Sequence, residues 1–164
     1  IVFFVRWLHV VSGIMWIGLL WYFNFVQIPS MPKIPDEQKP AISKVIAPEA
    51  LFWFRWAALS TVIFGLIQAW QLGFLIDGLA LGVTSKSAYH MMIGLGMWMG
   101  LIMAANVWFV IWPNQKKALG MVEATAEEKA AAARMAMLFS RTNTMLSIPM
   151  SYAMVSVHFY QMSG

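Results

Sequence analysis

Long apolar stretches dominate the sequence and are separated by short polar connections. A helix needs about 20 predominantly apolar residues to cross a bilayer core, and three stretches reach this length: 2–26, 50–75 and 88–112. A fourth stretch, 138–160, is polar in its first half and mainly apolar in its last dozen residues. An open hairpin end in its place would leave polar backbone in lipid. The pattern therefore predicts an all-α integral membrane protein with one domain, a bundle of four transmembrane helices.

The connections between these stretches differ in character. The first, 28–49, holds five prolines, which predicts an ordered but irregular loop. The second, 76–87, is short and turn-like. In the third, Thr125-x-x-Glu128 is a capping-box pattern before an alanine-rich run, so we predict a cytoplasmic helix over 126–137 that continues into the fourth span. The first apolar run is too long for a signal-peptide core, which predicts a retained helix, trimmed or not at its start.

Charge supports a membrane location and sets an orientation. Charged residues make up 11% of the chain, against roughly 25% in an average soluble domain. Of the 11 basic residues, only Arg6 and Lys86 lie outside the first and third connections and their flanks. Basic residues near span ends mark the cytoplasmic side, so both termini are predicted to face the periplasm from a bacterial inner membrane. These residues flank apolar runs and form no solvated basic stripe, so nucleic acid is not an expected partner.

The sequence has no cysteine, which excludes iron–sulfur clusters, thiolate zinc sites and thioether-linked haem. The predicted topology places His9, His90 and His158 within roughly one to two helical turns of the outer face. Imidazoles on facing membrane helices commonly hold redox cofactors, so these three are candidate metal ligands and haem b is the leading cofactor. Gly13 and Gly94 follow the first two at i+4 and would leave a bare patch of helix for a flat macrocycle. The alternative is that the histidines are interfacial hydrogen-bonders and that the glycines let helices approach closely.

A second polar group lies in the inner half of the predicted spans. Its members are Asn24, Gln27, Arg55, Asn106, Arg141, Thr142, Asn143 and Ser147. An arginine among amides could bind a quinone head group or a haem propionate; interhelical hydrogen bonding with a snorkelling arginine is the favoured alternative. No nucleophile and base can be paired, so the chain is not expected to be catalytic alone.

Three segments carry a family pattern: RWLHVVSGIMWIG at 6–18, WFRWAA at 53–58, and SRTNTMLSIPM at 140–150, which leads to His158-Phe159. Together they resemble the membrane domain at the N-terminus of bacterial urate oxidases of the urate hydroxylase type. The first segment alone also resembles small four-helix haem proteins of the protoporphyrinogen oxidase and copper-resistance D families. The resemblance implies a multi-span bundle, joined in the full-length enzymes to a cytochrome c domain. No Cys-x-x-Cys-His is present here, so urate oxidation by this chain alone is not expected.

The resemblance carries over the matching positions His9, Arg55, Asn143 and His158, with His90 where a third-helix histidine is expected. The resulting hypothesis is a b-type haem electron-transfer subunit of a larger respiratory or oxidoreductase complex. Its expected partners are other membrane subunits and a periplasmic cytochrome c, and its expected iron ligands are His9 and His90, with His158 as the substitute. The alternatives are a non-redox accessory subunit and a subunit that binds another tetrapyrrole pigment.

Overall fold

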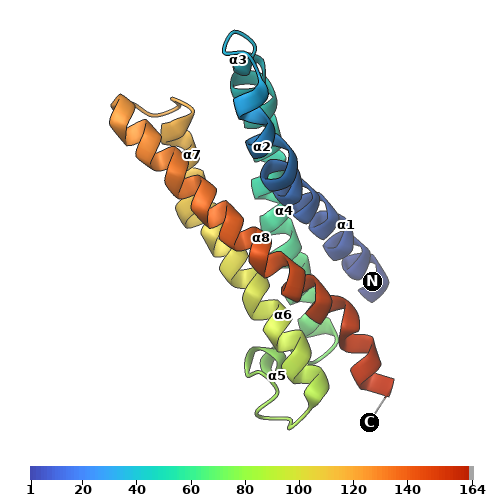
Figure 1. The fold of residues 1–164 in the computed structure, drawn as a ribbon. Helices are drawn as coiled ribbons and strands as arrows, with labels where there is room; N and C mark the ends of the chain where they lie inside the picture. Colours follow the sequence, from blue (N-terminus) through green and yellow to red (C-terminus); the bar gives the residue numbers. More distant parts are fainter. Residues whose placement is uncertain (163–164) are drawn as a thin grey trace.

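The computed structural model describes residues 1–162, and over this range the chain forms helices and turns without strands (Figure 1). This confirms the predicted all-α class. The long helices are α1 (Val2–Trp21), α4 (Ala47–Gln71), α6 (Ala88–Ala105) and α8 (Ala126–Met162). Figure 1 shows both chain ends and α5 (Leu75–Leu79) at one end of the molecule, and α3 (Lys39–Ala41) and α7 (Trp112–Ala118) at the other.

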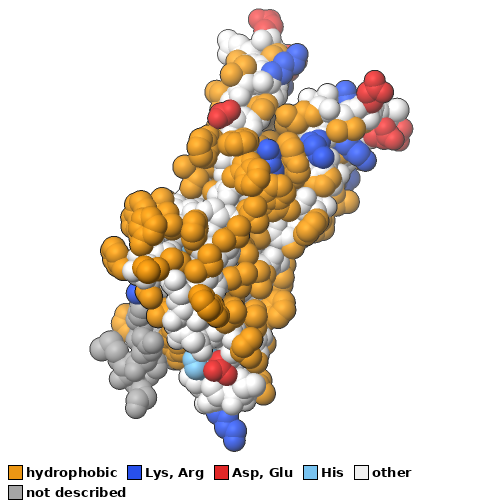
Figure 2. Space-filling view, turned by 180° about the vertical axis from the view of Figure 1, so that it is seen from behind, with side chains coloured by type: hydrophobic (Ala, Val, Ile, Leu, Met, Phe, Trp, Pro, Cys, Tyr) orange, Lys and Arg blue, Asp and Glu red, His pale blue; other side chains and the backbone are white. Residues whose placement is uncertain are grey.

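Three helical stretches are long and apolar enough to cross a membrane. With the short segments that continue the long helices, they are Val2–Lys33, Lys39–Gln71 and Ala88–Ala118. Helix α8 is longer than any of them but more polar. Charged side chains gather at the two ends of the molecule, and hydrophobic side chains cover the middle (Figure 2). These features support a multi-pass membrane protein.

The prediction of an irregular loop over 28–49 is wrong. Only residues 34–38 of this connection lie outside helical elements. The π-helical η1 (Tyr22–Gln27) continues α1 up to this connection. The elements that replace the loop are α2 (Ile28–Ser30), the 3₁₀ turn η2 (Met31–Lys33), α3 (Lys39–Ala41), the π-helical η3 (Ile42–Ile46) and the start of α4. The first two spans therefore continue as helices beyond their predicted ends.

The prolines explain why these helices persist. Three π-helical segments each end two residues before a proline: η1 before Pro29, η3 before Pro48, and η4 (Asn106–Ile111) before Pro113 in α7 (Trp112–Ala118). Proline has no backbone N–H, and its ring collides with the carbonyl four residues earlier. A π-helical turn is wider than an α-helical turn and relieves that collision. The prolines thus begin the helical segments that follow instead of ending the spans.

The long helices pack as two pairs, α1 with α4 and α6 with α8. In each pair the chain runs in opposite directions (Figure 1). The main core lies between the pairs and includes Trp16, Phe54 and Met103, each at most 1% exposed. A smaller core near α5 contains Phe74 and Val157.

The second and third connections agree with their predicted structures in part. Residues 76–87 include most of α5, and Gly82 adopts a left-handed backbone conformation (φ 69°). The capping box before α8 is confirmed: the Glu128 carboxylate accepts from the Thr125 N–H at 2.8 Å, and the Thr125 hydroxyl accepts from the Glu128 N–H at 3.2 Å. The Thr125 backbone bond lowers the pKa of Glu128 below its ordinary value.

Candidate functional site

His9 lies on the face of α1 that packs against α4. Its Nδ1 donates to the backbone carbonyl of Thr61 at 2.8 Å, since a carbonyl can only accept. The ring rests on Gly65, where an added Cβ would lie 2.8 Å from the imidazole Cε1. One turn further along the interface, the Ser12 and Ser60 hydroxyls share a hydrogen bond of 2.8 Å. Gly65 therefore creates the space in which His9 reaches the backbone of α4.

His90 lies in the first turn of α6. Its Nδ1 shares a hydrogen bond of 2.6 Å with the Ser85 hydroxyl, and its backbone N–H donates to Ser87, the N-cap of the helix. The imidazole stacks on Phe74 with ring centroids 6.4 Å apart and meets Tyr89 edge-on. Turn residues and aromatic rings thus hold His90 in place.

The two histidines lie at the same end of the molecule, because α1 and α6 both begin there (Figure 1). Arg6, in the first turns of α1, lies within electrostatic range of Tyr89 on α6. His9 and His90 nevertheless have separate partners, and within the described residues no group of three or more His, Asp or Glu side chains is placed to hold a metal ion. The side chain of His158, the third predicted ligand, lies outside the described residues.

The structure shows which elements face the two i+4 glycines. A Cβ on Gly94 would overlap the carbonyl oxygen of Gly78 in α5, so this glycine lets α5 pack directly on α6. A Cβ on Gly13 would have Thr61 Cγ2 as its nearest neighbour, at 3.8 Å. The patch beside His90 is therefore covered by α5, whereas the patch beside His9 faces α4 and leaves room for a Cβ. The glycine that does accommodate an imidazole, Gly65, lies on the facing helix and has no sequence spacing to His9 that would reveal it.

Part of the inner polar group converges on α8. Asn143 is fully buried; its amide donates to the Met103 carbonyl, and its side-chain oxygen accepts from the Asn106 amide, both at 2.9 Å. On the α1 side, Asn24 donates to Ser140 at 2.8 Å. These bonds connect α8 to both helices that flank it.

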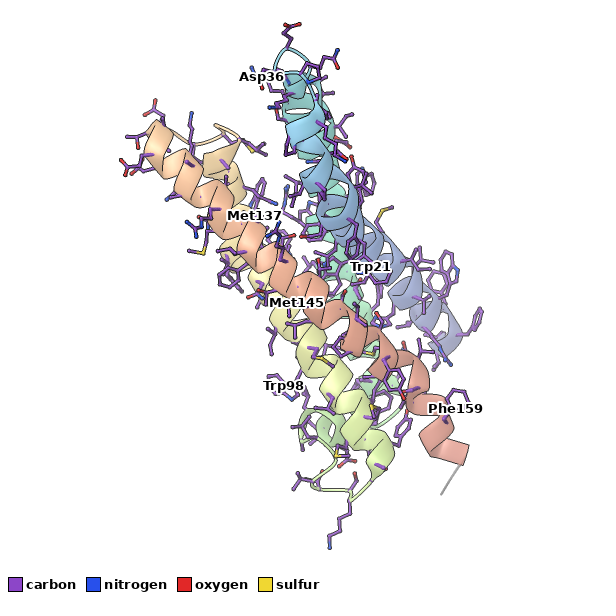
Figure 3. All side chains as sticks on the ribbon, in the orientation of Figure 1. Trp21, Asp36, Trp98, Met137, Met145 and Phe159 are labelled. Carbon is purple, nitrogen blue, oxygen red and sulfur yellow. The ribbon has the colours of Figure 1, made fainter. Side chains whose placement is uncertain are left out.

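A further bond lies nearer the middle of the bundle. The Trp21 indole donates to Ser147 at 2.9 Å, and Trp21 lies on α1 beside the part of α8 that carries Met145 (Figure 3). Ser147 is fully buried, and its hydroxyl donates a hydrogen bond to the Thr144 carbonyl at 2.7 Å. These members of the inner polar group form hydrogen bonds between helices, as the favoured alternative predicts.

Arg55 does not join these amides. Its guanidinium lies 3.4 Å from the centre of the Trp112 ring and donates to the Leu51 carbonyl at 3.2 Å. Arg141 and Thr142, expected to converge with it, are exposed. Sequence reasoning did not identify Trp112 as the partner of Arg55, because the contact joins two helices that no sequence spacing relates.

A comparison with known protein families matches residues 75–164 to the family described as urate oxidase N-terminal. The chain belongs to this family. The resemblance seen in the sequence is thereby confirmed. The comparisons with curated proteins and with solved structures found no match. In this urate oxidase N-terminal chain the matched range begins at α5 and holds His90, Asn143 and His158, whereas His9 and Arg55 precede it.

Proposed function

We propose that this urate oxidase N-terminal chain is a membrane-embedded b-type haem electron-transfer subunit of a larger oxidoreductase assembly. One observation carries the proposal: both described imidazoles are tied to the protein through Nδ1, His9 to a backbone carbonyl and His90 to a hydroxyl. Metal-binding histidines usually engage one ring nitrogen with a carbonyl, carboxylate or water, which fixes the tautomer and leaves the other nitrogen for the metal. The donor chemistry of both side chains therefore fits an iron ligand.

The residues of the chain have distinct tasks in this proposal. His9 and His90 are the ligands through Nε2, and His158 is the substitute for either. The Thr61 carbonyl holds the Nδ1 proton of His9, and Gly65 leaves room for the ring. A bound haem would supply one-electron chemistry by cycling its iron between the ferrous and ferric states.

The position of the ligands indicates how electrons would enter and leave. His90 lies in the first turn of α6, and His9 lies eight residues from the start of the chain, about 12 Å along a helix. Both are close enough to one end of the bundle for exchange with an adjacent subunit or a periplasmic cytochrome c. A quinone is the second candidate cofactor.

Removal of the proposed ligands tests the haem. Replacing either His9 or His90 by alanine is expected to abolish the reduced-minus-oxidised difference spectrum of the purified protein, because each variant would lack one of the two proposed iron ligands. Ser12→Ala is the matched control: it removes a hydrogen bond from the same α1–α4 interface, one turn away, and should leave the spectrum unchanged. Full haem retention in both histidine variants would exclude the pair.

An accessory subunit without redox activity is the second candidate function. The observation that favours it is the α8 network, which joins three helices without needing any cofactor. Protein that folds after haem-replete expression and shows no visible absorption would support this function over the first.

The proposal includes α8 as a fourth span, with both chain ends on the outer side. Eight of the 11 basic residues lie at the end bearing α3 and α7 or along the adjoining part of α8, with Arg55 just inside, and basic residues mark the cytoplasmic side. A cysteine placed within residues 29–40 is therefore expected to resist an impermeant thiol reagent in intact cells, whereas one added after Gly164 should react. The chain has no native cysteine to interfere. Labelling of the first site alone would reverse the orientation and place the histidines at the inner face.

A further inference from the structure

Two cations meet on one indole ring at the inner end of the bundle. The Arg55 guanidinium of α4 lies 3.4 Å from the centre of the Trp112 ring, and Lys116 Nζ lies 5.5 Å from it. Such contacts hold a cation in place without neutralising its charge. The salt bridge found among the described residues joins Lys39 to Asp36. Within this part of the chain, no carboxylate therefore lies within salt-bridge distance of Arg55 or Lys116.

The cation pair lies where the molecule divides. Towards α3 and α7 the two helix pairs separate into two arms, and Lys and Arg side chains lie around the base of the notch between them (Figures 1 and 2). The Arg55–Trp112 contact joins α4 of one arm to α7 of the other. A guanidinium has five N–H donors, and the Leu51 carbonyl is its one described hydrogen-bond acceptor here. An anion at this position would therefore meet two charges and several free donors.

An apolar groove continues from this point toward the middle of the bundle. It has a volume of about 450 Å³ and runs between α4 and α6, with its walls formed by Leu59, Val62, Leu101, Ala105, Trp108 and Phe109. Leu59 and Val62 follow Arg55 at i+4 and i+7, so they share its face of α4. Trp108 precedes Trp112 by four residues and brings a buried indole N–H without a partner in the described structure.

The dimensions of the groove match one leaflet. Trp112 and Leu101 are separated by 11 residues, about 16 Å along a helix, which is about half of a bilayer core. The Arg55 and Lys116 charges thus lie at the head-group end of the apolar groove, and the groove has the depth that an acyl chain occupies.

We infer that this notch and groove bind one anionic phospholipid, with the phosphate between Arg55 and Lys116 and an acyl chain along α4 and α6. Charge complementarity selects the phosphate. A zwitterionic lipid offers the same chain without net negative charge. The cations therefore select an anionic head group, and the groove binds the acyl chain.

Lipid titration of the full chain in detergent, followed by native mass spectrometry, tests the inference. Phosphatidylglycerol is expected to bind on the order of 10- to 30-fold more tightly than phosphatidylcholine, because two basic residues near a membrane surface each strengthen attraction to an anionic lipid by roughly fivefold. The variant R55Q/K116Q should lose this preference. The variant K117Q should keep it, since Lys117 is the adjacent, exposed lysine.

A groove-filling variant keeps the test independent of the charges. Ala105→Phe should weaken phosphatidylglycerol binding at least fivefold by occupying the acyl-chain path, whereas Ile102→Phe, on the same helix but outside the groove lining, should not. Inorganic phosphate added at millimolar concentration should not displace the lipid. Equal binding of the two lipids, unchanged preference in R55Q/K116Q, or displacement by inorganic phosphate would each overturn the inference.

Discussion

Replacing Gly94 by alanine is expected to lower the free energy of unfolding by about 3 kcal/mol, near the upper end for overpacked cores. The added Cβ would overlap the carbonyl oxygen of Gly78, and its next neighbours are the backbone atoms of Gly78 and Leu81. Backbone cannot rotate away as a side chain can, so α5 has to separate from α6. The measurement is the thermal unfolding midpoint of the purified protein in detergent, followed by circular dichroism.

Gly100 provides the control on the same helix. An alanine Cβ there meets no atom within 4 Å, and alanine is the better helix former. Gly100→Ala should therefore leave the unfolding midpoint unchanged or raise it. Equal midpoints for the two variants would show that α5 does not pack on Gly94 as described.

The contrast between these glycines shows what sequence spacing can and cannot reveal. Spacing at i+4 correctly places Gly94 on a helix face shared with His90, but it cannot say which element covers that face. The covering element is α5, a short helix inside a connection expected to be only a turn. Gly65 was missed for the converse reason, because its relation to His9 exists only after α1 and α4 have packed.

The proline-rich connection failed as a prediction for a different physical reason. Proline breaks a helix when its ring meets the carbonyl of the preceding turn, and the prediction took each proline as a break. Here π-helical segments precede Pro29, Pro48 and Pro113 and absorb that collision. Two asparagines of the α8 network, Asn24 and Asn106, lie in such segments. The wide turns therefore also set the directions of side chains that bind α8.

The inner polar group was identified well by composition and only partly by position. Asparagine and serine in an apolar span must find hydrogen-bond partners, which is why Asn143 and Ser147 could be expected to face inward. An arginine has another option, since its charge can rest on an aromatic ring at the interface. Arg55 uses that option with Trp112, and no pattern in the sequence distinguishes the two outcomes.

Replacing Asn143 by leucine is expected to lower the free energy of unfolding by about 2–3 kcal/mol, the scale for leaving buried polar groups without partners. The change keeps the branching of the side chain at Cγ but leaves the Asn106 amide, which donates to Asn143 at 2.9 Å, without its acceptor. It also removes the donor to the Met103 carbonyl. Thr142→Val tests the adjacent, exposed position, where the hydroxyl bonds only within its own helix to the Leu138 carbonyl, and should change the unfolding midpoint little.

A double-mutant cycle of Asn106→Ala with Asn143→Ala isolates the pair and should give a coupling of about 1 kcal/mol. All of these variants are compared as haem-free protein, so that cofactor binding does not contribute to the unfolding midpoint. An unchanged midpoint for Asn143→Leu would mean that Asn143 does not hold α8 to α6.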